Sequence, residues 1–135
     1  MHVFVLEDDP LRIQWFRERF IGHDLTIAES VSEALEKFTG TYDLACLDHD
    51  LGGQQMVDSE EENTGAAFLR LKAEAFADNR GFVIVHSYNP VGAAQMVAML
   101  QDVWADVIAA PFLGPTFTRE LDEWVSDCEA MEEAG

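Results

Sequence analysis

VFVLEDDP, residues 3–10, and LACLDHDLGG, residues 44–53, are two apolar runs that each end abruptly in acidic side chains. Such runs are typical of buried strands in a parallel sheet, and parallel strands bring their carboxyl ends to one edge. The acids that follow them are Glu7, Asp8, Asp48 and Asp50. Gathered carboxylates repel one another unless a cation lies among them, and oxygen ligands suit Mg²⁺ or Mn²⁺. We therefore predict a divalent metal site held by these four residues.

The rest of the chain alternates apolar runs with amphipathic stretches. We expect strands at residues 2–6, 24–30, 42–48, 82–87 and 105–112, and helices at 10–20, 31–38, 64–77, 90–103 and 115–131. Asp9 before Pro10 and Asn89 before Pro90 are typical helix N-caps. This alternation predicts one α/β domain over residues 1–135, a doubly wound five-stranded parallel sheet, with an acidic loop at about 52–63.

Charge and cysteine usage limit the classes of function. A net charge of -18, from 26 acids against 8 basic residues, argues against binding of duplex nucleic acid through its phosphates. We interpret most of this charge as solvated surface, and an acidic decoy is the alternative. Two cysteines without paired spacing indicate reduced thiols and a cytoplasmic protein. The sequence shows no signal peptide or membrane span and does not indicate an oligomeric state.

Over nearly its whole length the chain resembles the receiver domain of two-component response regulators. LEDDP is similar to the segment whose paired acids hold Mg²⁺ in that family, with Glu7 and Asp8 as the pair. Asp48 matches the aspartate that accepts a phosphoryl group, and Ser87 matches the Thr or Ser that ends the fourth strand. The resemblance implies the receiver, flavodoxin-like topology with strand order 2-1-3-4-5.

One departure from receivers and three sequence strings point to a more specific resemblance. Receivers carry a lysine before the proline that follows the fifth strand, and this chain has Ala110 there. The strings LDHDLG, NTG and HSYNPVGA together resemble the cyclic-phosphate processing receiver domains, a family predicted to act on terminal cyclic phosphates. This resemblance implies a metal-dependent phosphoesterase that processes cyclic or terminal phosphates of nucleotides or RNA ends.

Opening a cyclic phosphate requires a proton for the leaving oxygen, and His49 and His86 are the candidate donors. The candidate catalytic residues are therefore Asp48, His86, His49 and Ser87. Successive side chains of a strand point to opposite faces of the sheet, so His49 would point away from Asp48 and Asp50, and His86 away from Ser87. The alternative is that both histidines are structural and hydrogen-bonded.

The candidate phosphate-binding or substrate-binding residues are Ser87, Asn89, Thr64 and Gly65. Helix capping is the alternative role for Asn89, because it precedes a proline. Two other functions stay open: a receiver-type signalling module phosphorylated on Asp48, and a non-catalytic nucleotide-binding protein.

Overall fold

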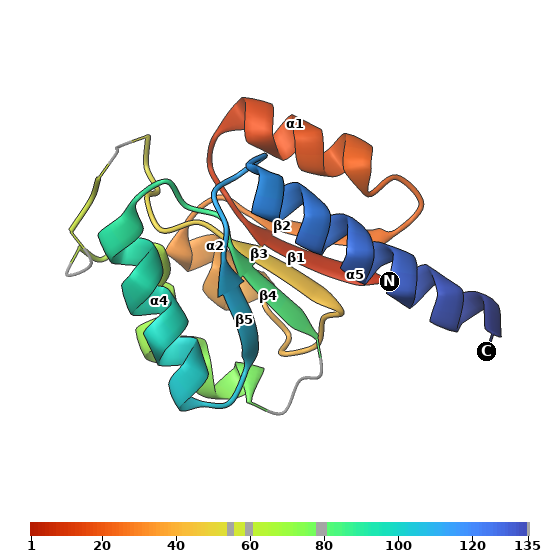
Figure 1. Cartoon of the computed structure of the whole chain (residues 1–135). Coiled ribbons are helices and arrows are strands. Elements are labelled where there is room, and N and C mark those ends of the chain that lie inside the picture. Colours follow the sequence, from red (N-terminus) through yellow and green to blue (C-terminus); the bar gives the residue numbers. More distant parts are fainter. Residues whose placement is uncertain (54–55, 59–60, 78–80, 135) are drawn as a thin grey trace.

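The computed structural model describes residues 1–53, 56–58, 61–77 and 81–134 (Figure 1). The strands are β1 (His2–Leu6), β2 (Asp24–Ala28), β3 (Leu44–Leu47), β4 (Phe82–Val85) and β5 (Asp106–Ala109). They form one parallel sheet in the order β2-β1-β3-β4-β5, which confirms the predicted fold class and strand order. The helices are α1 (Pro10–Arg19), α2 (Val31–Lys37), α3 (Gly65–Lys72), α4 (Pro90–Asp102) and α5 (Pro115–Ala134), with a short 3-10 helix η1 (Ala73–Phe76) after α3.

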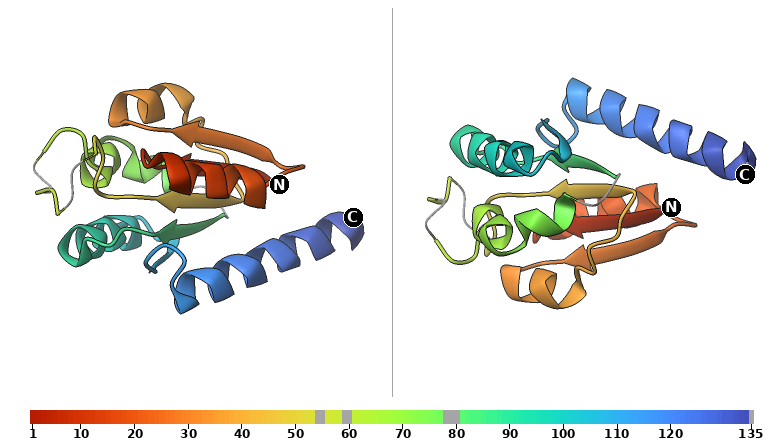
Figure 2. Two further views of the ribbon diagram at one scale, coloured as in Figure 1. Left: turned by 90° about the horizontal axis from the view of Figure 1, so that it is seen from above. Right: turned by 90° about the horizontal axis from the view of Figure 1, so that it is seen from below.

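Helices cover both faces of the sheet (Figures 1 and 2). In β1, Val3 and Val5 join the apolar cluster beneath α1 and α5, whereas Phe4 and Leu6 join the cluster beneath α2, α3 and α4. All four of these side chains are buried. The strand is therefore apolar on both faces, as expected for the interior of a parallel sheet, and only its carboxyl end is left for polar chemistry.

The predicted strands at 24–30, 42–48, 82–87 and 105–112 are longer than the strands in the structure. Beyond β2, β3 and β4 the next residues leave the strand to cap a helix or to form the polar edge, and beyond β5 Ala110 and Phe112 join an apolar cluster. Ser30 is the N-cap of α2, and its side chain accepts a hydrogen bond from the Glu33 amide. Apolar content alone does not mark the point where the backbone leaves the sheet.

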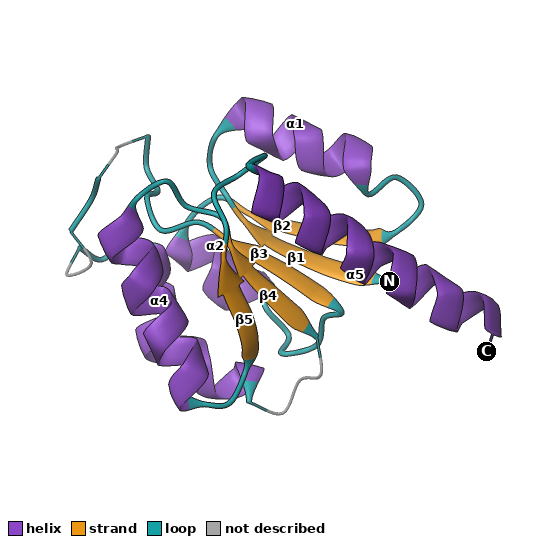
Figure 3. Ribbon diagram, viewed as in Figure 1, coloured by secondary structure: helices purple, strands orange, loops and turns teal. Residues whose placement is uncertain are grey.

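The loops at the carboxyl ends of the strands meet at one edge of the sheet (Figure 3). The predicted acidic loop at about 52–63 lies at this edge, and its residues 54–55 and 59–60 are outside the described residues. An isolated antiparallel bridge between Asp50 and Thr64 joins the two ends of this loop. Within the described part of the chain, no helix combines the length and apolar character needed to cross a membrane.

Candidate functional site

A cavity of about 240 Å³ lies at this edge, where β1, β3 and β4 end. The four acids predicted as metal ligands all line it, and Asp9, Arg12, Ser87 and Tyr88 are among the other lining residues. The structure therefore brings together the acids that follow two strands separated by about forty residues of sequence. Their hydrogen bonds, however, divide them into two kinds.

Glu7 is fully buried, and its carboxylate is already occupied. Oε2 accepts hydrogen bonds from the amides of Asp8 and Asp9, at 3.0 and 3.1 Å. Oε1 lies 2.9 Å from His86 Nε2 and 3.5 Å from Arg12 Nη1. Burial by itself raises the pKa of Glu7, but the hydrogen bond and charge of His86, the Asp9 amide and Arg12 together hold that pKa below its ordinary value. Two backbone amides and His86 thus use three of the roughly four lone-pair positions of this carboxylate, with Arg12 near the fourth, so Glu7 mainly supports the site.

Glu7→Gln is expected to lower the free energy of unfolding by about 2–3 kcal/mol at pH 7, measured by urea denaturation. In either orientation the NH₂ group of the new glutamine faces hydrogen-bond donors, which are the Asp8 and Asp9 amides on one side and His86 and Arg12 on the other. Because the pKa of Glu7 is lowered, its contribution is complete above pH 4.5 and is lost as pH falls through the lowered value. The difference from the wild type should therefore shrink in acid. Glu18→Gln on the exposed face of α1 is the control, and an equal loss there would contradict this role.

Asp50 is also occupied, and its partners belong to the acidic loop and to α4. Oδ1 accepts from His49 Nδ1 at 2.8 Å, Asn89 Nδ2 at 3.0 Å and the Val57 amide at 3.1 Å, and Oδ2 accepts from the Met56 amide at 2.7 Å. Partial burial raises the pKa of Asp50, but these hydrogen bonds outweigh it and lower that pKa overall. Asp50 thus fixes the loop against the helix.

His49 and Asn89 make structural contacts with α4 and with the acidic loop. The His49 ring is buried beneath the first turn of α4, where a Cβ on Gly92 would approach it within 2.4 Å. His49 does not line the cavity. Asn89 caps α4 by accepting from the Gly92 amide at 3.0 Å, while its Nδ2 donates to Asp50 and to the Val57 carbonyl. The capping alternative for Asn89 therefore describes its contacts in the structure.

Asp8 and Asp48 each retain a carboxylate oxygen without a hydrogen bond from the described residues. Asp8 Oδ2 accepts from the Gly53 amide at 2.7 Å, and Asp48 Oδ1 accepts from the His49 amide at 2.9 Å. Among the described residues no further hydrogen bond to either carboxylate is found. Burial, aided by the charge of Glu7, raises the pKa of Asp48 to about 7. A divalent cation in the cavity would displace that proton and restore the ionised form.

His86 lies behind the cavity and not in its lining. Its ring is fully buried between Phe16, Phe112 and Phe117, with ring centroids 5.5–6.3 Å away. Nε2 must carry a proton to bond the Glu7 carboxylate, and Nδ1 is buried without a hydrogen-bond partner in the described structure. His86 can therefore reach the cavity only through Glu7.

Of the remaining predicted substrate-binding residues, one lines the cavity and the others make structural contacts. Ser87 is buried, lines the cavity and accepts a hydrogen bond from the Asn89 amide at 3.0 Å. Thr64 caps α3 by accepting from the Ala67 amide at 3.1 Å, and donates to the Glu61 carbonyl. Gly65 packs against the backbone of Asp48, and neither Thr64 nor Gly65 lines the cavity. Only Ser87 of the four predicted binding residues faces this space.

Arg12 is a cavity residue that the sequence motifs did not indicate, and it lies beside Tyr88, which belongs to the HSYNP string. The Arg12 guanidinium lies 4.7 Å from the Tyr88 ring centroid and 5.2 Å from that of Phe112. Tyr88 also donates from its hydroxyl to the Phe112 carbonyl. The available signal was the Asp9–Pro10 helix start, which places residue 12 in the first turn of α1, beside the acids that end β1.

The donor set of the cavity fits a hard divalent cation. Mg²⁺ is commonly bound in proteins through one or two carboxylates, with waters and substrate phosphates as the other ligands, and Asp8 and Asp48 could supply the two carboxylates. Glu7, Asp48 and His86 also place one ligand atom each within 4.8 Å of one another. A cation between those three would have to break the buried hydrogen bond from His86 to Glu7, so we favour the pair that lines the cavity with free oxygens.

Solved receiver domains share this fold at low sequence identity. The non-phosphorylated HemR receiver domain from Leptospira biflexa is 18% identical, with a TM-score of 0.65, covering 93% of this chain and 94% of its own. A CheY-like receiver domain protein from Methanospirillum hungatei JF-1 is 18% identical, with a TM-score of 0.61 and coverage of 99% and 98%. The response regulator TrrA from Thermotoga maritima, solved in complex with Mg²⁺-BeF, is 18% identical, with a TM-score of 0.57 and coverage of 91% and 97%.

No curated protein matches the chain. The family model described as the cyclic-phosphate processing receiver domain matches residues 1–102, which is more than half of the chain. The matched segment contains both acid-tipped strands as well as the DHDLG and HSYNP motifs. The resemblance seen in the sequence is confirmed, and the chain belongs to the cyclic-phosphate processing receiver domain family.

Proposed function

We propose that the chain is a metal-dependent phosphoesterase that processes cyclic or terminal phosphates of nucleotides or RNA ends. One observation carries this proposal: Asp8 and Asp48 keep free carboxylate oxygens in the same cavity as Arg12. Two carboxylates suit a hard cation, and a guanidinium suits a phosphate. The family's name and the Mg²⁺-BeF complex of TrrA support this assignment.

The chain's own residues divide the work at this site. Asp8 and Asp48 would hold Mg²⁺ or Mn²⁺, which when bound neutralises charge on phosphoryl oxygens and activates water. The buried Glu7–His86 pair fixes the turn that carries Asp8, because Glu7 accepts from the amides of Asp8 and Asp9. Asp50 holds the loop that contributes the Gly53 amide to Asp8.

The histidines take positioning roles in this proposal. No histidine is found among the described residues that line the cavity, so the proton for the leaving oxygen would come from water. Ser87 lines the cavity, and its hydroxyl could donate to a phosphoryl oxygen while its oxygen accepts from the Asn89 amide. Charge neutralisation and orientation, not acid catalysis by a side chain, are then the main contributions of the protein.

Asp8→Asn is expected to lower kcat/KM for a 2′,3′-cyclic nucleotide with Mg²⁺ or Mn²⁺ by about 10²-fold or more. Asp9→Asn is the matched control. It removes one charge from the adjacent cavity residue, but Asp9 caps α1 through Oδ1, and Asn caps a helix equally well. Product formation is followed chromatographically, with and without EDTA. Wild-type protein that binds metal but hydrolyses no cyclic mononucleotide or dinucleotide would overturn the proposal.

Phosphorylation of Asp48 is the second candidate function. It is favoured by the position of Asp48, which follows β3 and faces the cavity, as the phosphoacceptor does in receivers. Incubation with Mg²⁺ and a small phosphodonor would then give an acid-labile adduct on Asp48, detectable by intact-protein mass spectrometry. A lasting adduct without turnover of cyclic phosphates would favour signalling, and turnover without an adduct favours the phosphoesterase.

A further inference from the structure

The cavity has one basic side chain in a strongly acidic lining. Five acids line it, namely Glu7, Asp8, Asp9, Asp48 and Asp50, and Arg12 is the one Lys or Arg found among the described lining residues. Two acids retain oxygens for a cation, so a bound ion would occupy their side of the cavity. A phosphate that reached the ion would still carry negative charge beside Glu7 and Asp50. A second positive group is needed where the phosphate faces away from the ion.

The position from which receivers supply that positive charge carries no charged side chain in this chain. Ala110 replaces the receiver lysine, and it is 1% exposed within the apolar cluster that contains Phe16 and Phe117. It does not line the cavity. The positive group must therefore come from another element, and α1 provides it.

Arg12 makes one long ion pair with Glu7, and two aromatic rings hold its guanidinium. Tyr88 and Phe112 both lie within stacking distance of its guanidinium. In the described structure its one hydrogen bond is to Glu7 Oε1 at 3.5 Å, which is long for a pair of charged groups. A guanidinium has five N–H donors, and stacking fixes its plane while leaving its edge for bidentate contact with a phosphate.

We propose that Arg12 binds the phosphoryl group of a nucleotide in this cavity, replacing from α1 the charge that receivers supply after the fifth strand. Tyr88 is its positioning residue: the ring supports the guanidinium, and the hydroxyl bonds the Phe112 carbonyl. The ligand class is a nucleoside phosphate with at least two non-bridging oxygens on one phosphorus. This assignment deepens the proposed function and rests on it for the nature of the substrate.

The test is calorimetric titration of the whole chain with 3′-AMP in Mg²⁺, which measures binding without turnover. Arg12→Gln is expected to weaken 3′-AMP binding at least about 20-fold, and Arg12→Lys by about 5-fold, because lysine keeps the charge but loses the planar fork. Tyr88→Leu should weaken it less than Arg12→Gln. Mn²⁺ affinity should stay within about 2-fold of the wild type in these variants, since none of them changes a carboxylate ligand of the metal. Retained Mn²⁺ binding would also show that the variants are folded.

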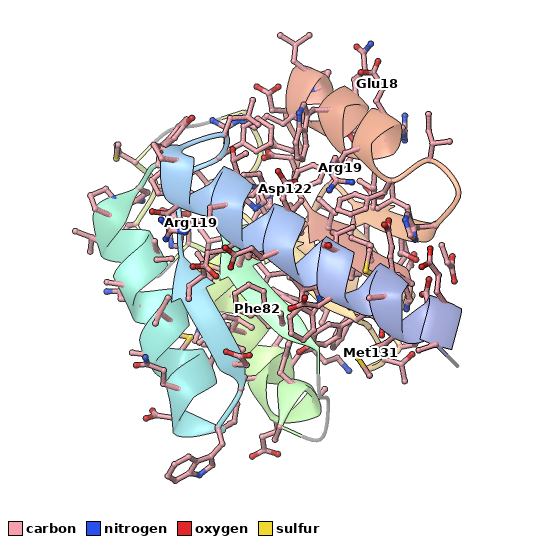
Figure 4. The ribbon with its side chains drawn as sticks, turned by 45° about the vertical axis from the view of Figure 1, so that its right-hand side comes forward. Glu18, Arg19, Phe82, Arg119, Asp122 and Met131 are labelled. Atoms are coloured by element: carbon pink, nitrogen blue, oxygen red, sulfur yellow. The ribbon has the colours of Figure 1, made fainter. Side chains whose placement is uncertain are left out.

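Arg19→Gln is the matched control for these variants. Arg19 lies on the same helix, has a ring partner in Phe20 at 5.4 Å and pairs with Asp122 of α5 at 3.0 Å, outside the cavity (Figure 4). It should bind 3′-AMP like the wild type. Adenosine, which lacks the phosphate, should show no dependence on Arg12.

Three results would overturn the assignment: no binding of 3′-AMP by the wild type, equal binding by Arg12→Gln, or an equal loss with Arg19→Gln. Failure of the proposed function looks different. Arg12-dependent binding of 3′-AMP without hydrolysis of any cyclic nucleotide would refute the phosphoesterase and retain the phosphate contact. Hydrolysis with an unchanged KM in Arg12→Gln would refute the contact and retain the enzyme.

Discussion

Asp48→Asn is expected to abolish cation-dependent hydrolysis and, at the same time, to stabilise the metal-free protein at pH 8. The loss of activity should reach about 10³-fold, because an amide is a poorer ligand than a carboxylate for a hard cation. The gain in stability has a separate cause. Burial raises the pKa of Asp48 to about 7 from an ordinary 3.8, so ionisation of this carboxyl opposes folding.

The sign of the pH dependence follows from proton binding. Between pH 3.8 and about 7 the folded protein holds a proton on Asp48 that the unfolded chain has lost. Raising the pH through this window therefore lowers the free energy of unfolding of the wild type, and the loss persists above it. Asparagine does not ionise and keeps the size of the side chain. We expect the variant to be more stable than the metal-free wild type by about 2 kcal/mol at pH 8, and nearly equal at pH 4.

Urea denaturation in EDTA at pH 4, 6 and 8 measures this difference. Adding Mg²⁺ should stabilise the wild type at pH 8 by mass action, and the variant should not respond. The response of the wild type should fall at pH 6, where protons compete with the ion for Asp48. A variant that is less stable than the wild type at pH 8, or one that still responds to Mg²⁺, would contradict the assignment.

Gly65→Ala is expected to destabilise the fold by about 3 kcal/mol or more, although it adds one methyl group at a helix start. The new Cβ would lie 2.2 Å from the Asp48 carbonyl oxygen and 2.6 Å from Met96 Cε. The methionine can move, but the carbonyl belongs to the backbone at the end of β3. The Gly65 amide also donates to the His49 carbonyl at 2.9 Å, which ties the two segments together. Relief of the collision therefore requires a shift of the segment that carries Asp48.

A double variant separates the two collisions. Adding Met96→Ala to Gly65→Ala removes the methionine contact, and because Met96 is fully buried the reference is Met96→Ala alone. The double variant should stay clearly less stable than that reference, because the backbone collision remains. Gly40→Ala gives the contrast. No atom of the described residues lies within 4 Å of its added Cβ, and its φ of +83° opposes the change by about 1 kcal/mol. A double variant as stable as Met96→Ala alone would show that side-chain packing, rather than the Asp48 backbone, makes glycine necessary at residue 65.

The sequence was sufficient for the fold because apolar periodicity and helix caps are local signals. β1 (His2–Leu6) and the cap at Asp9 lie where the pattern predicts them. The acids of the site were also visible, since each follows a buried strand. Their separate roles were not, because His86 at Glu7, and Asn89 with the Met56 and Val57 amides at Asp50, reach these acids only in the folded chain.

Arg12 is a site residue that the sequence pattern could not identify. A single arginine in an amphipathic helix is indistinguishable by pattern from Arg17 or Arg19 of that helix. Only the position of α1 above the end of β1, together with Tyr88 from the loop after β4, makes it a cavity residue. The histidines show a related limit: their proximity to Asp48 and Ser87 along the chain suggested proton donors, and the fold buries both rings outside the cavity lining.

Paramagnetic broadening of the ³¹P resonance of 3′-AMP by Mn²⁺ tests most directly whether a cation and a phosphate share this cavity. With wild-type protein we predict broadening that saturates at one Mn²⁺ per chain and is reversed by EDTA or excess Mg²⁺. Asp8→Asn and Asp48→Asn should abolish the protein-dependent broadening, and Asp9→Asn should retain it. Broadening that persists in both Asp8→Asn and Asp48→Asn, or Mn²⁺ that binds the wild type without affecting the phosphorus, would contradict the proposed site.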